Sequence, residues 1–337
     1  MTKNVLYLGN NLSNPKTNTA FMQGLAAALE DEGYTVRCKS GYTAKVLRLL
    51  DMVGACFRFK TWADVVLIDT YSTQNFYYAL AVSQCCCLLG LPYIPILHGG
   101  NLPQRLQEHP KLSERIFKNA KTLVSPSLYL QVAFENAGYS NVVYIPNSLN
   151  LEQYPFKTRT YDNIGLLWVR SFSNIYNPKL AVDILKGLQE KGYPTELCMV
   201  GPDTDGSLAE VKVYANRLGV QIKFTGKLSK AEWISLSKEY NLFINTTNFD
   251  NMPVSVIEAM VLGLPVVSTN VGGMPYLIED GVDGVLVPPN NAQAFVSEII
   301  RLVHHPQQTN TLAIQARKKV EGFDWELVKL KWIEVLG

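Results

Sequence analysis

The sequence lacks a long hydrophobic run. Although 47% of its 337 residues are hydrophobic, no apolar segment reaches the roughly 18 to 20 residues that a membrane-spanning helix needs. The first ten residues, MTKNVLYLGN, predict a strand and not a signal peptide, which would have a basic start and a longer apolar centre. We therefore expect a globular, cytoplasmic protein with two domains, each able to bury its own core.

Paired cysteine motifs and a strong net charge are also missing. Residues 85–87 are three adjacent cysteines without CxxC spacing, which predicts reduced thiols on a buried helix and no metal site. A net charge of only +2 argues against a nucleic-acid partner. The two halves differ, because residues 1–150 hold 13 Lys and Arg against 9 Asp and Glu, a net of +4. Residues 151–337 hold 18 against 20, a net of −2, so different partners are expected for the halves.

Short β-branched runs alternate with amphipathic segments along the whole chain, which predicts parallel sheets with helical crossovers. The strands expected in the first half are NVLYLGN, TVRCKS, DVVLIDT, YIPILHG, TLVSPS and VVYIPNS, with helices at residues 19–32 and 74–89. Those expected in the second half are NIGLLWV, TELCMVG, IKFTG, NLFINTT and PVVST, with helices at residues 178–191, 207–218 and 231–239.

The pattern predicts an α/β fold of two doubly wound, Rossmann-like domains, residues 1–150 and 151–337. The polar and irregular segment 147–163 is the expected link. The pattern leaves open whether the last helix returns to the first domain. Because ligands of open parallel sheets bind beyond the carboxyl ends of the strands, two facing domains would place a cleft between those ends.

Two carboxylates stand out in the stretch NTTNFDNMPVSVIEAMVLGLPVVSTNVGG. A helix that starts at Pro253 and ends before Gly263 would carry Glu258 and leave Asp250 in the preceding loop. At about 1.5 Å of rise per residue the two acids would lie roughly 10 Å apart, with free backbone amides between them. This suits a ligand with hydroxyls at both ends and negative charge in the middle. The alternative, an acid on a solvated face, is disfavoured because Glu258 lies in an apolar helix.

This stretch resembles the retaining glycosyltransferases of the GT-B fold, specifically the large family four. In that family a Glu, seven residues and a second Glu precede a GxPVV(S/A)T strand and a Gly-Gly loop. The corresponding residues here are Asp250, Glu258, Gly263, Pro265, Val266, Val267, Ser268, Thr269, Gly272 and Gly273. The resemblance is strong over residues 195–289 and weaker but continuous elsewhere. It implies that the first acid binds the hydroxyls of the donor sugar and the second binds the ribose diol. Asp250 is one methylene shorter than the family's Glu, so the identity of the sugar stays open.

The resemblance implies further donor contacts in the second half. Arg170, after the strand GLLWV, corresponds to the Arg that faces the diphosphate, although a surface ion pair is the alternative. The family's Lys five or six residues later is replaced by Ile175 and Tyr176, and Lys179 is the expected substitute unless it is simply solvated. The other implied donor-binding residues are Asn251, Met252, Pro253, Val254, Gly272 and Gly273 around the diphosphate and Thr225, Gly226 and Gly201 near the nucleobase. The Gly pair alone would also fit an ordinary turn.

In the first half, His98 closes the strand YIPIL and precedes Gly99, Gly100 and Asn101. A lone His in this place is often structural, but the resemblance implies a loop that contacts the transferred sugar or its phosphate. The first loop, GNNLSNPKTNTA, departs from the family's Gly-Gly pattern. The expected acceptor-side residues are Asn11, Thr17, Asn18, Gly99, Gly100 and Asn101, whose polar groups can bind sugar hydroxyls.

Residues 41–60 combine apolar positions with Lys45, Arg48, Arg58 and Lys60. Relatives in the family dock on membranes through basic amphipathic helices, which implies contact with an anionic membrane here. A helix that packs on its own sheet is the alternative, because basic residues commonly flank core helices.

We therefore predict a metal-independent, retaining glycosyltransferase without a cofactor. It would move a sugar from a nucleotide sugar, expected to be UDP-linked, to a glycan or lipid-linked glycan, with His98, Asp250 and Arg170 at the reacting centre. The expected location is the cytoplasm, with attachment to the inner face of the membrane left open. The alternatives are a non-catalytic nucleotide-sugar-binding protein, which the missing Lys favours, and a UDP-sugar epimerase of the same fold, which needs further acids.

Overall fold

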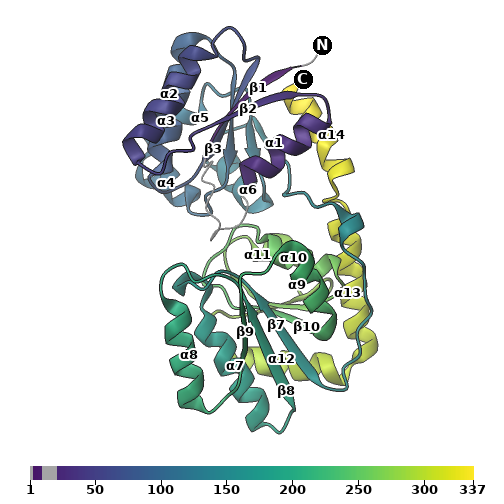
Figure 1. The fold of residues 1–337 in the computed structure, drawn as a ribbon. Helices are drawn as coiled ribbons and strands as arrows, with labels where there is room; N and C mark the ends of the chain where they lie inside the picture. Colours follow the sequence, from purple (N-terminus) through teal and green to yellow (C-terminus); the bar gives the residue numbers. More distant parts are fainter. Residues whose placement is uncertain (1–2, 10–20) are drawn as a thin grey trace. The chain divides into compact units, whose positions relative to one another are not determined.

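The computed structural model describes residues 3–9 and 21–337. The chain forms two compact units, which we call unit 1 and unit 2 (Figure 1). Unit 1 contains the residues up to Pro146 together with Val328–Gly337, and unit 2 is Asn147–Leu327. Within the described ranges, no helix has both the length and the apolar character needed to cross a membrane.

Unit 1 is built on a parallel sheet with the strand order β2-β1-β3-β4-β5-β6. Its strands are β1 (Asn4–Leu8), β2 (Thr35–Lys39), β3 (Val65–Thr70), β4 (Tyr93–Leu97), β5 (Leu123–Ser125) and β6 (Val142–Tyr144). Its helices are α1 (Phe21–Asp31), α2 (Lys45–Arg58), α3 (Asn75–Leu89), α4 (Leu102–Glu108), α5 (Pro110–Phe117), α6 (Leu128–Asn136) and most of α14 (Trp325–Leu336). All six strands predicted for the first half are confirmed.

Unit 2 repeats this plan with the strand order β12-β11-β10-β7-β8-β9, again parallel. Its strands are β7 (Ile164–Val169), β8 (Thr195–Val200), β9 (Lys223–Gly226), β10 (Leu242–Asn245), β11 (Val266–Thr269) and β12 (Val285–Val287). Its helices are α7 (Pro178–Glu190), α8 (Ser207–Leu218), α9 (Lys230–Leu236), α10 (Val254–Val261), α11 (Met274–Leu277), α12 (Ala292–His304) and α13 (Pro306–Glu321).

Unit 2 differs from the prediction in several details, among them helices α11, α12 and α13, which were not predicted. The edge strand β12, which pairs only with β11, was missed. Helix α10 begins at Val254 and not at Pro253, which takes the cap position with an extended backbone. The helix predicted for residues 231–239 is α9 followed by a 3₁₀ turn at Ser237–Glu239.

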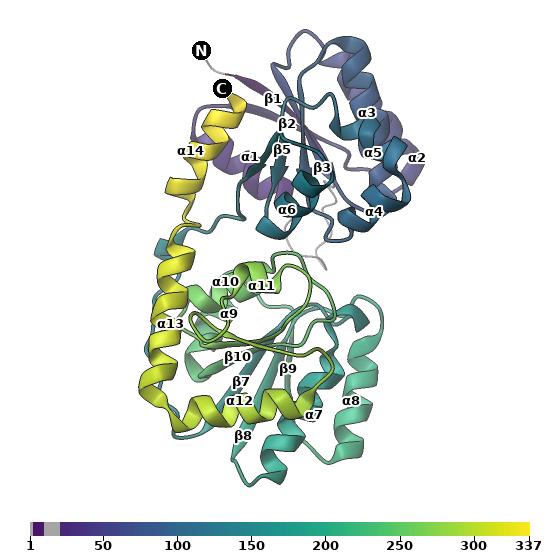
Figure 2. The ribbon, with the colours of Figure 1, turned by 180° about the vertical axis from the view of Figure 1, so that it is seen from behind.

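Side chains on opposite faces of each sheet pack under different helices. Along β7, Leu166 and Trp168 join the core beneath α7 and α12, whereas Leu167 joins the core beneath α10 and α13. Helices α7 and α12 lie together on one face of the sheet, as Figure 2 shows. Both faces are therefore covered, as a parallel sheet requires.

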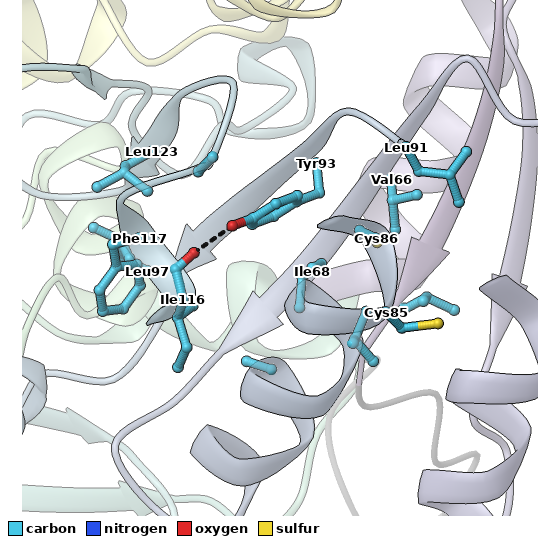
Figure 3. Close-up of a cluster of buried hydrophobic side chains, with 14 of the residues drawn as sticks. Val66, Ile68, Cys85, Cys86, Leu91, Tyr93, Leu97, Ile116, Phe117 and Leu123 are labelled. Atoms are coloured by element: carbon cyan, nitrogen blue, oxygen red, sulfur yellow. Dashed lines mark hydrogen bonds between the residues drawn. The ribbon is translucent and has the colours of Figure 1, made fainter. Parts of the chain in front are cut away.

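The cysteine-rich helix α3 packs into the core of unit 1. Figure 3 shows Cys85 and Cys86 among the side chains around Val66 and Ile68, close to Tyr93, whose hydroxyl donates to the Ile116 carbonyl at 2.8 Å. Cys85 and Cys86 are buried, as predicted for core thiols, but Cys87 is exposed. That part of the prediction was wrong, because a helix turns about 100° per residue and three adjacent side chains cannot share one face.

The segment 147–163 is mostly irregular and is held to unit 2 by a buried arginine. Arg159 is 4% exposed and donates from Nη1 to the Ser237 and Tyr240 carbonyls, at 2.9 and 3.1 Å. Its Nη2 donates to the Leu262 carbonyl at 2.9 Å. Burial lowers the pKa of Arg159 to about 10. These carbonyls follow α9 and α10, so Arg159 caps the ends of both helices.

Candidate functional site

Each sheet has one point where successive strands are added on opposite sides. In unit 1 this point lies between β1 and β3, and in unit 2 it lies between β7 and β10. Open α/β sheets bind ligands beyond the carboxyl ends of the strands at such a point. Asp69 lies at the end of β3, and Arg170 and Asp250 follow β7 and β10. The predicted residues of unit 2 thus lie where the topology favours a ligand.

Arg170 and Asp250 form an ion pair in unit 2. Each side chain is 14% exposed, and the guanidinium lies 3.9 Å from the ring centroid of Tyr176. Burial raises the pKa of Asp250, while Arg170 and the amide of Asn251, which donates to Oδ1 at 2.9 Å, act in the opposite direction. Arg170 Nε is buried without a hydrogen-bond partner in the described part of the chain. Only Nη2 pairs with Asp250, so Nη1 is the donor that the guanidinium keeps for an anionic ligand.

The Gly272-Gly273 loop lies directly against the Asp250 loop. Gly273 N donates to the Asp250 carbonyl at 2.9 Å. A Cβ atom at Gly273 would lie 1.7 Å from the Asn251 carbonyl oxygen, and one at Gly272, where φ is +54°, would lie 2.2 Å from that of Asp250. Both glycines are therefore required by the close approach of two backbones, which an ordinary turn would not need. The amide of Gly273 is already used, so of the pair Gly272 is the candidate for a ligand contact.

Glu258 is buried in α10 and has two partners on one oxygen. Its Oε1 accepts from the Tyr154 hydroxyl at 2.7 Å and also pairs with Lys230 Nζ. The Glu258 side chain is 5% exposed, whereas that of Lys230 is 47% exposed. Lys230 is the first residue of α9. Ser229 and Glu232 cap the amino-terminal end of this helix with a reciprocal capping box. Burial lowers the pKa of Lys230 to about 8.

Tyr154 and Lys230 were not predicted. Tyr154 lies in the segment taken for a link, where nothing in the sequence indicates a partner. Lys230 carried one signal, because a positive charge in the first turn of a helix opposes the helix dipole and calls for a nearby carboxylate. Only the fold shows that this carboxylate is Glu258, 28 residues later in the chain.

The structure does not bring Lys179 to the Arg170 ion pair. Lys179 Nζ binds Glu210 Oε2 at 2.7 Å on the outside of α7 and α8, and both side chains are exposed. They line a surface groove of about 440 Å³ between these helices. The expected substitute for the family's Lys is thus occupied by a surface ion pair.

The predicted nucleobase residues gather beside the Arg170 backbone. Gly201 N donates to the Gly226 carbonyl at 2.9 Å, and Thr225 Oγ1 donates to the same oxygen at 2.9 Å. Gly201 has φ of +149°, and a Cβ atom there would lie 1.8 Å from the Arg170 carbonyl oxygen.

At the start of α10, Met252 and Pro253 are buried and Val254 is partly exposed.

In unit 1, His98 belongs to a buried network with two residues that were not predicted. His98 Nε2 lies 2.9 Å from Asp69 Oδ1, which also accepts from the Tyr7 hydroxyl at 2.8 Å. Because a carboxylate only accepts hydrogen bonds, Nε2 carries the proton. Burial, and then the charge of Asp69, raises the pKa of Tyr7, which keeps its hydroxyl protonated. A charged residue within the buried run VVLIDT was the available signal for Asp69.

The aromatic rings around His98 hold it from two sides. Its ring stacks on Tyr71 at 5.1 Å and meets the edge of Phe21 at 4.7 Å between centroids. Gly99 follows in a tight place, where a Cβ atom would lie 2.5 Å from Ser72 N. Gly100 and Asn101 lead into α4, where Asn101 is exposed and makes no side-chain cap. The remaining expected acceptor-side residues, Asn11, Thr17 and Asn18, lie outside the described residues.

No group of three or more His, Cys, Asp or Glu side chains able to hold a metal ion occurs in residues 3–9 and 21–337.

Comparisons with known proteins relate the chain to sugar-transferring enzymes. The model of a family described as "Glycosyl transferases group 1" matches residues 152–319. The amylovoran biosynthesis glycosyltransferase AmsK of Erwinia amylovora is 25% identical over 240 residues, 68% of this chain and 59% of that protein. Sulfoquinovosyl transferase SQD2 of Arabidopsis thaliana is 26% identical over 156 residues, 45% of this chain and 29% of that protein. The chain thus spans less than two thirds of the length of these curated relatives.

Solved structures share the fold over almost the whole chain. Anabaena HepE, solved in complex with UDP-glucose, has a TM-score of 0.78 at 18% identity and is matched over 99% of both chains. Sucrose-phosphate synthase from Thermosynechococcus elongatus has a TM-score of 0.80 at 16% identity, over 99% of this chain and 98% of that one. These matches confirm the predicted fold class of two parallel α/β sheets.

Proposed function

Because this chain belongs to the glycosyl transferases group 1 family, we propose that it is a retaining, metal-independent glycosyltransferase. The donor is a nucleotide sugar, expected to be UDP-linked, and the acceptor is a glycan or lipid-linked glycan. The observation that carries the proposal is the grouping of Arg170, Asp250 and the loop Gly272-Gly273 beyond the strand ends of unit 2. Glu258 lies within α10, the helix that follows the Asp250 loop. The UDP-glucose complex of HepE, a protein of the same fold, and the name of AmsK support the donor and acceptor classes.

In the proposed reaction the protein places charged groups around the donor, and no side chain forms a covalent bond to the sugar. Arg170 holds the diphosphate through Nη1, which Asp250 does not use, and the N–H groups of Val254 and Ser255, which have no intrahelical acceptor, add to the positive end of α10. The leaving phosphate oxygen draws the proton from the acceptor hydroxyl on the same face of the sugar, so the anomeric configuration is retained. Cations and amides that stabilise the departing diphosphate lower the barrier without a metal.

The other residues bind and orient the donor. Asp250, held by Arg170, faces the hydroxyls of the sugar, and Glu258 binds the ribose diol. His98 of unit 1 contacts the transferred sugar through Nδ1, which is left as an acceptor because Nε2 carries the proton and donates it in a hydrogen bond to Asp69. A non-catalytic nucleotide-sugar-binding protein is the second candidate, because Lys179 is occupied by Glu210 and so does not supply the family's second cation.

Release of nucleoside diphosphate tests the proposal. We expect slow hydrolysis of one member of a panel of UDP-, GDP- and ADP-linked sugars, unchanged by EDTA and lost in Glu258→Ala. Glu210→Ala is the matched control, because it also removes a glutamate of unit 2 but one on the outer surface. Binding of a donor without any release would favour the binding protein. Loss of activity in EDTA, restored by Mg²⁺ or Mn²⁺, would contradict metal independence.

Contact with an anionic membrane at its cytoplasmic face is part of the proposal. Helix α2 exposes Val46, Leu47 and Leu50, which are 71%, 52% and 60% exposed, and it begins at Lys45. Its inner face buries Met52, Ala55 and Cys56. Arg48, expected among the basic docking residues, is only 8% exposed and donates to the Tyr42 carbonyl at 2.9 Å, so it is not part of the exposed face.

A further inference from the structure

The two partners of Glu258 crowd onto a single oxygen. Tyr154 and Lys230 both reach Oε1, whereas Oε2 has no donor among the residues that the structure describes. Oε2 is also not one of the fully enclosed, unpartnered side-chain atoms. A ligand hydroxyl can therefore donate to Oε2 without displacing either partner.

Lys230 has spare donors at the same place. An ammonium group has three protons, and Glu258 uses one of them. The side chain is 47% exposed, and its ammonium lies 5.9 Å from the ring centroid of Tyr154. The capping box of Ser229 and Glu232 fixes the backbone of Lys230, so the ammonium is anchored from a rigid helix end. A ligand oxygen beside Oε2 would thus meet a positive donor.

Burial favours a Lys230 that stays in place when a ligand binds. Glu258 is 3% exposed as a residue, and a buried carboxylate that loses its counter-ion suffers a large desolvation penalty. Displacement of Lys230 by a neutral hydroxyl would leave that charge with Tyr154 alone. We therefore treat the ion pair as part of the binding surface and not as a contact that the ligand must break before it can bind.

We propose that Glu258 and Lys230 together clamp the cis-diol of the nucleotide's ribose. One hydroxyl donates to Glu258 Oε2, and the oxygen of the neighbouring hydroxyl accepts from Lys230 Nζ. The pair thereby accepts a hydrogen bond from one hydroxyl of the diol and donates one to the other, whereas a carboxylate alone can only accept. This inference rests on the proposed function for the location of the ribose, but the role of Lys230 is additional to it.

The test compares UDP with 3′-deoxy-UDP and 2′-deoxy-UDP by titration calorimetry. In the wild-type protein we expect each missing hydroxyl to weaken binding by about ten-fold or more, since each one removes a hydrogen bond to a charged group. In Lys230→Met the affinity for UDP should fall by about ten-fold, and the penalty for one of the two deoxy ligands should largely disappear. Lys230→Arg should restore most of that penalty. Lys238→Met is the matched control, because Lys238 is an exposed lysine in the 3₁₀ turn that follows α9.

The outcomes separate this inference from the proposed function. If Lys230→Met keeps the wild-type affinity and both deoxy penalties, Lys230 is only a counter-ion and the inference is wrong. Tighter UDP binding by Lys230→Met would show that Lys230 blocks the site and must be displaced by the ligand, which also overturns the inference. If the wild-type protein binds none of UDP, GDP and ADP, the proposed function itself is wrong, and the clamp is wrong with it. Lys230→Arg gives the same comparison if the Met variant does not fold.

Discussion

A buried carboxylate in each unit, Asp69 in unit 1 and Glu258 in unit 2, is bound in the same way. One oxygen of Asp69 and one oxygen of Glu258 each accept from a tyrosine hydroxyl, at 2.8 and 2.7 Å, and from one basic side chain. The bases differ, because the side chain of His98 is 9% exposed and that of Lys230 is 47% exposed. An enclosed base has its orientation fixed by the carboxylate, whereas an open base keeps donors for a ligand. The same pairing thus suits positioning in unit 1 and binding in unit 2.

The largest expected effect separates Glu258 from Asp250. Asp250→Ala should lower turnover on the order of a hundred-fold, since misplacing the sugar by about 1 Å has that cost. It should not weaken the affinity for free UDP, which lacks the sugar, because the loss of Asp250 also frees Arg170 for the diphosphate. Glu258→Ala should weaken UDP binding by about ten- to hundred-fold, the value of a charge-assisted hydrogen bond. Calorimetry and turnover assays measure both, and equal losses of UDP affinity with unchanged thermal unfolding would contradict this division of roles.

The next prediction breaks the network in unit 1. Asp69→Leu removes the acceptor of both Tyr7 and His98 and should lower the free energy of unfolding by about 1–3 kcal/mol, the penalty of buried unpaired polar groups. It should also release the His98 tautomer, so that ¹⁵N NMR shows protonated Nδ1 as well as Nε2.

The control in unit 1 is Asp69→Asn, which keeps an acceptor oxygen in nearly the same shape. It should retain most of the stability and the Nε2-protonated form. A wild-type spectrum dominated by protonated Nδ1 would show that Asp69 does not orient His98.

A smaller effect is expected from pH at the open base of unit 2. The pKa of Lys230 is lowered to about 8, so its ammonium is lost as the pH rises through that value. Tyr154, which also faces Glu258, has its pKa raised by burial and does not titrate there. UDP affinity should therefore decline several-fold between about pH 7 and 9 in the wild-type protein but not in Lys230→Arg, whose guanidinium stays charged. Parallel pH profiles of the two proteins would exclude Lys230 as the titrating group.

The smallest effect concerns the surface of unit 1. The first half of the chain, which supplies most of this unit, is more basic than the second half. Each near-surface cation contributes about 1 kcal/mol to binding an anionic bilayer. Lys45→Gln, at the exposed start of α2, should lower co-sedimentation with liposomes that contain anionic lipid by about five-fold. Arg48→Gln should change it less, because Arg48 is buried. Equal sedimentation of the parent and Lys45→Gln would leave α2 with a structural role alone.

The sequence was most informative where a local pattern determines the structure. Eleven of the twelve strands in the described part of the chain follow from β-branched runs. Arg170 could be located because it comes directly after such a run, and Asp250 because it lies in the loop before the predicted helix of Glu258. The pairing of these two side chains could not be foreseen, since 80 residues separate them in the chain.

The missed residues share one physical cause. Tyr154 and Lys230 meet Glu258 across 104 and 28 residues, and Tyr7 meets Asp69 across 62. Such contacts depend on which strands become neighbours and not on any local period. Lys179 is the opposite case. Its charge and its position along the chain suited a place beside Arg170, but in the fold it pairs with Glu210 on the outer surface.

The composition of unit 1 has a consequence for the order in which the protein is made. Its last helix, α14, belongs mostly to this unit, where Trp332 is 2% exposed, Lys331 Nζ donates to the Tyr144 carbonyl at 3.2 Å, and α14 lies beside α1 (Figures 1 and 2). Ribosomes deliver the amino-terminal part first, and domains generally fold as units during synthesis. Unit 2 therefore leaves the ribosome before unit 1 has its closing helix, so the unit that begins first is completed last. Until then the apolar surface that Trp332 covers remains open to chaperones.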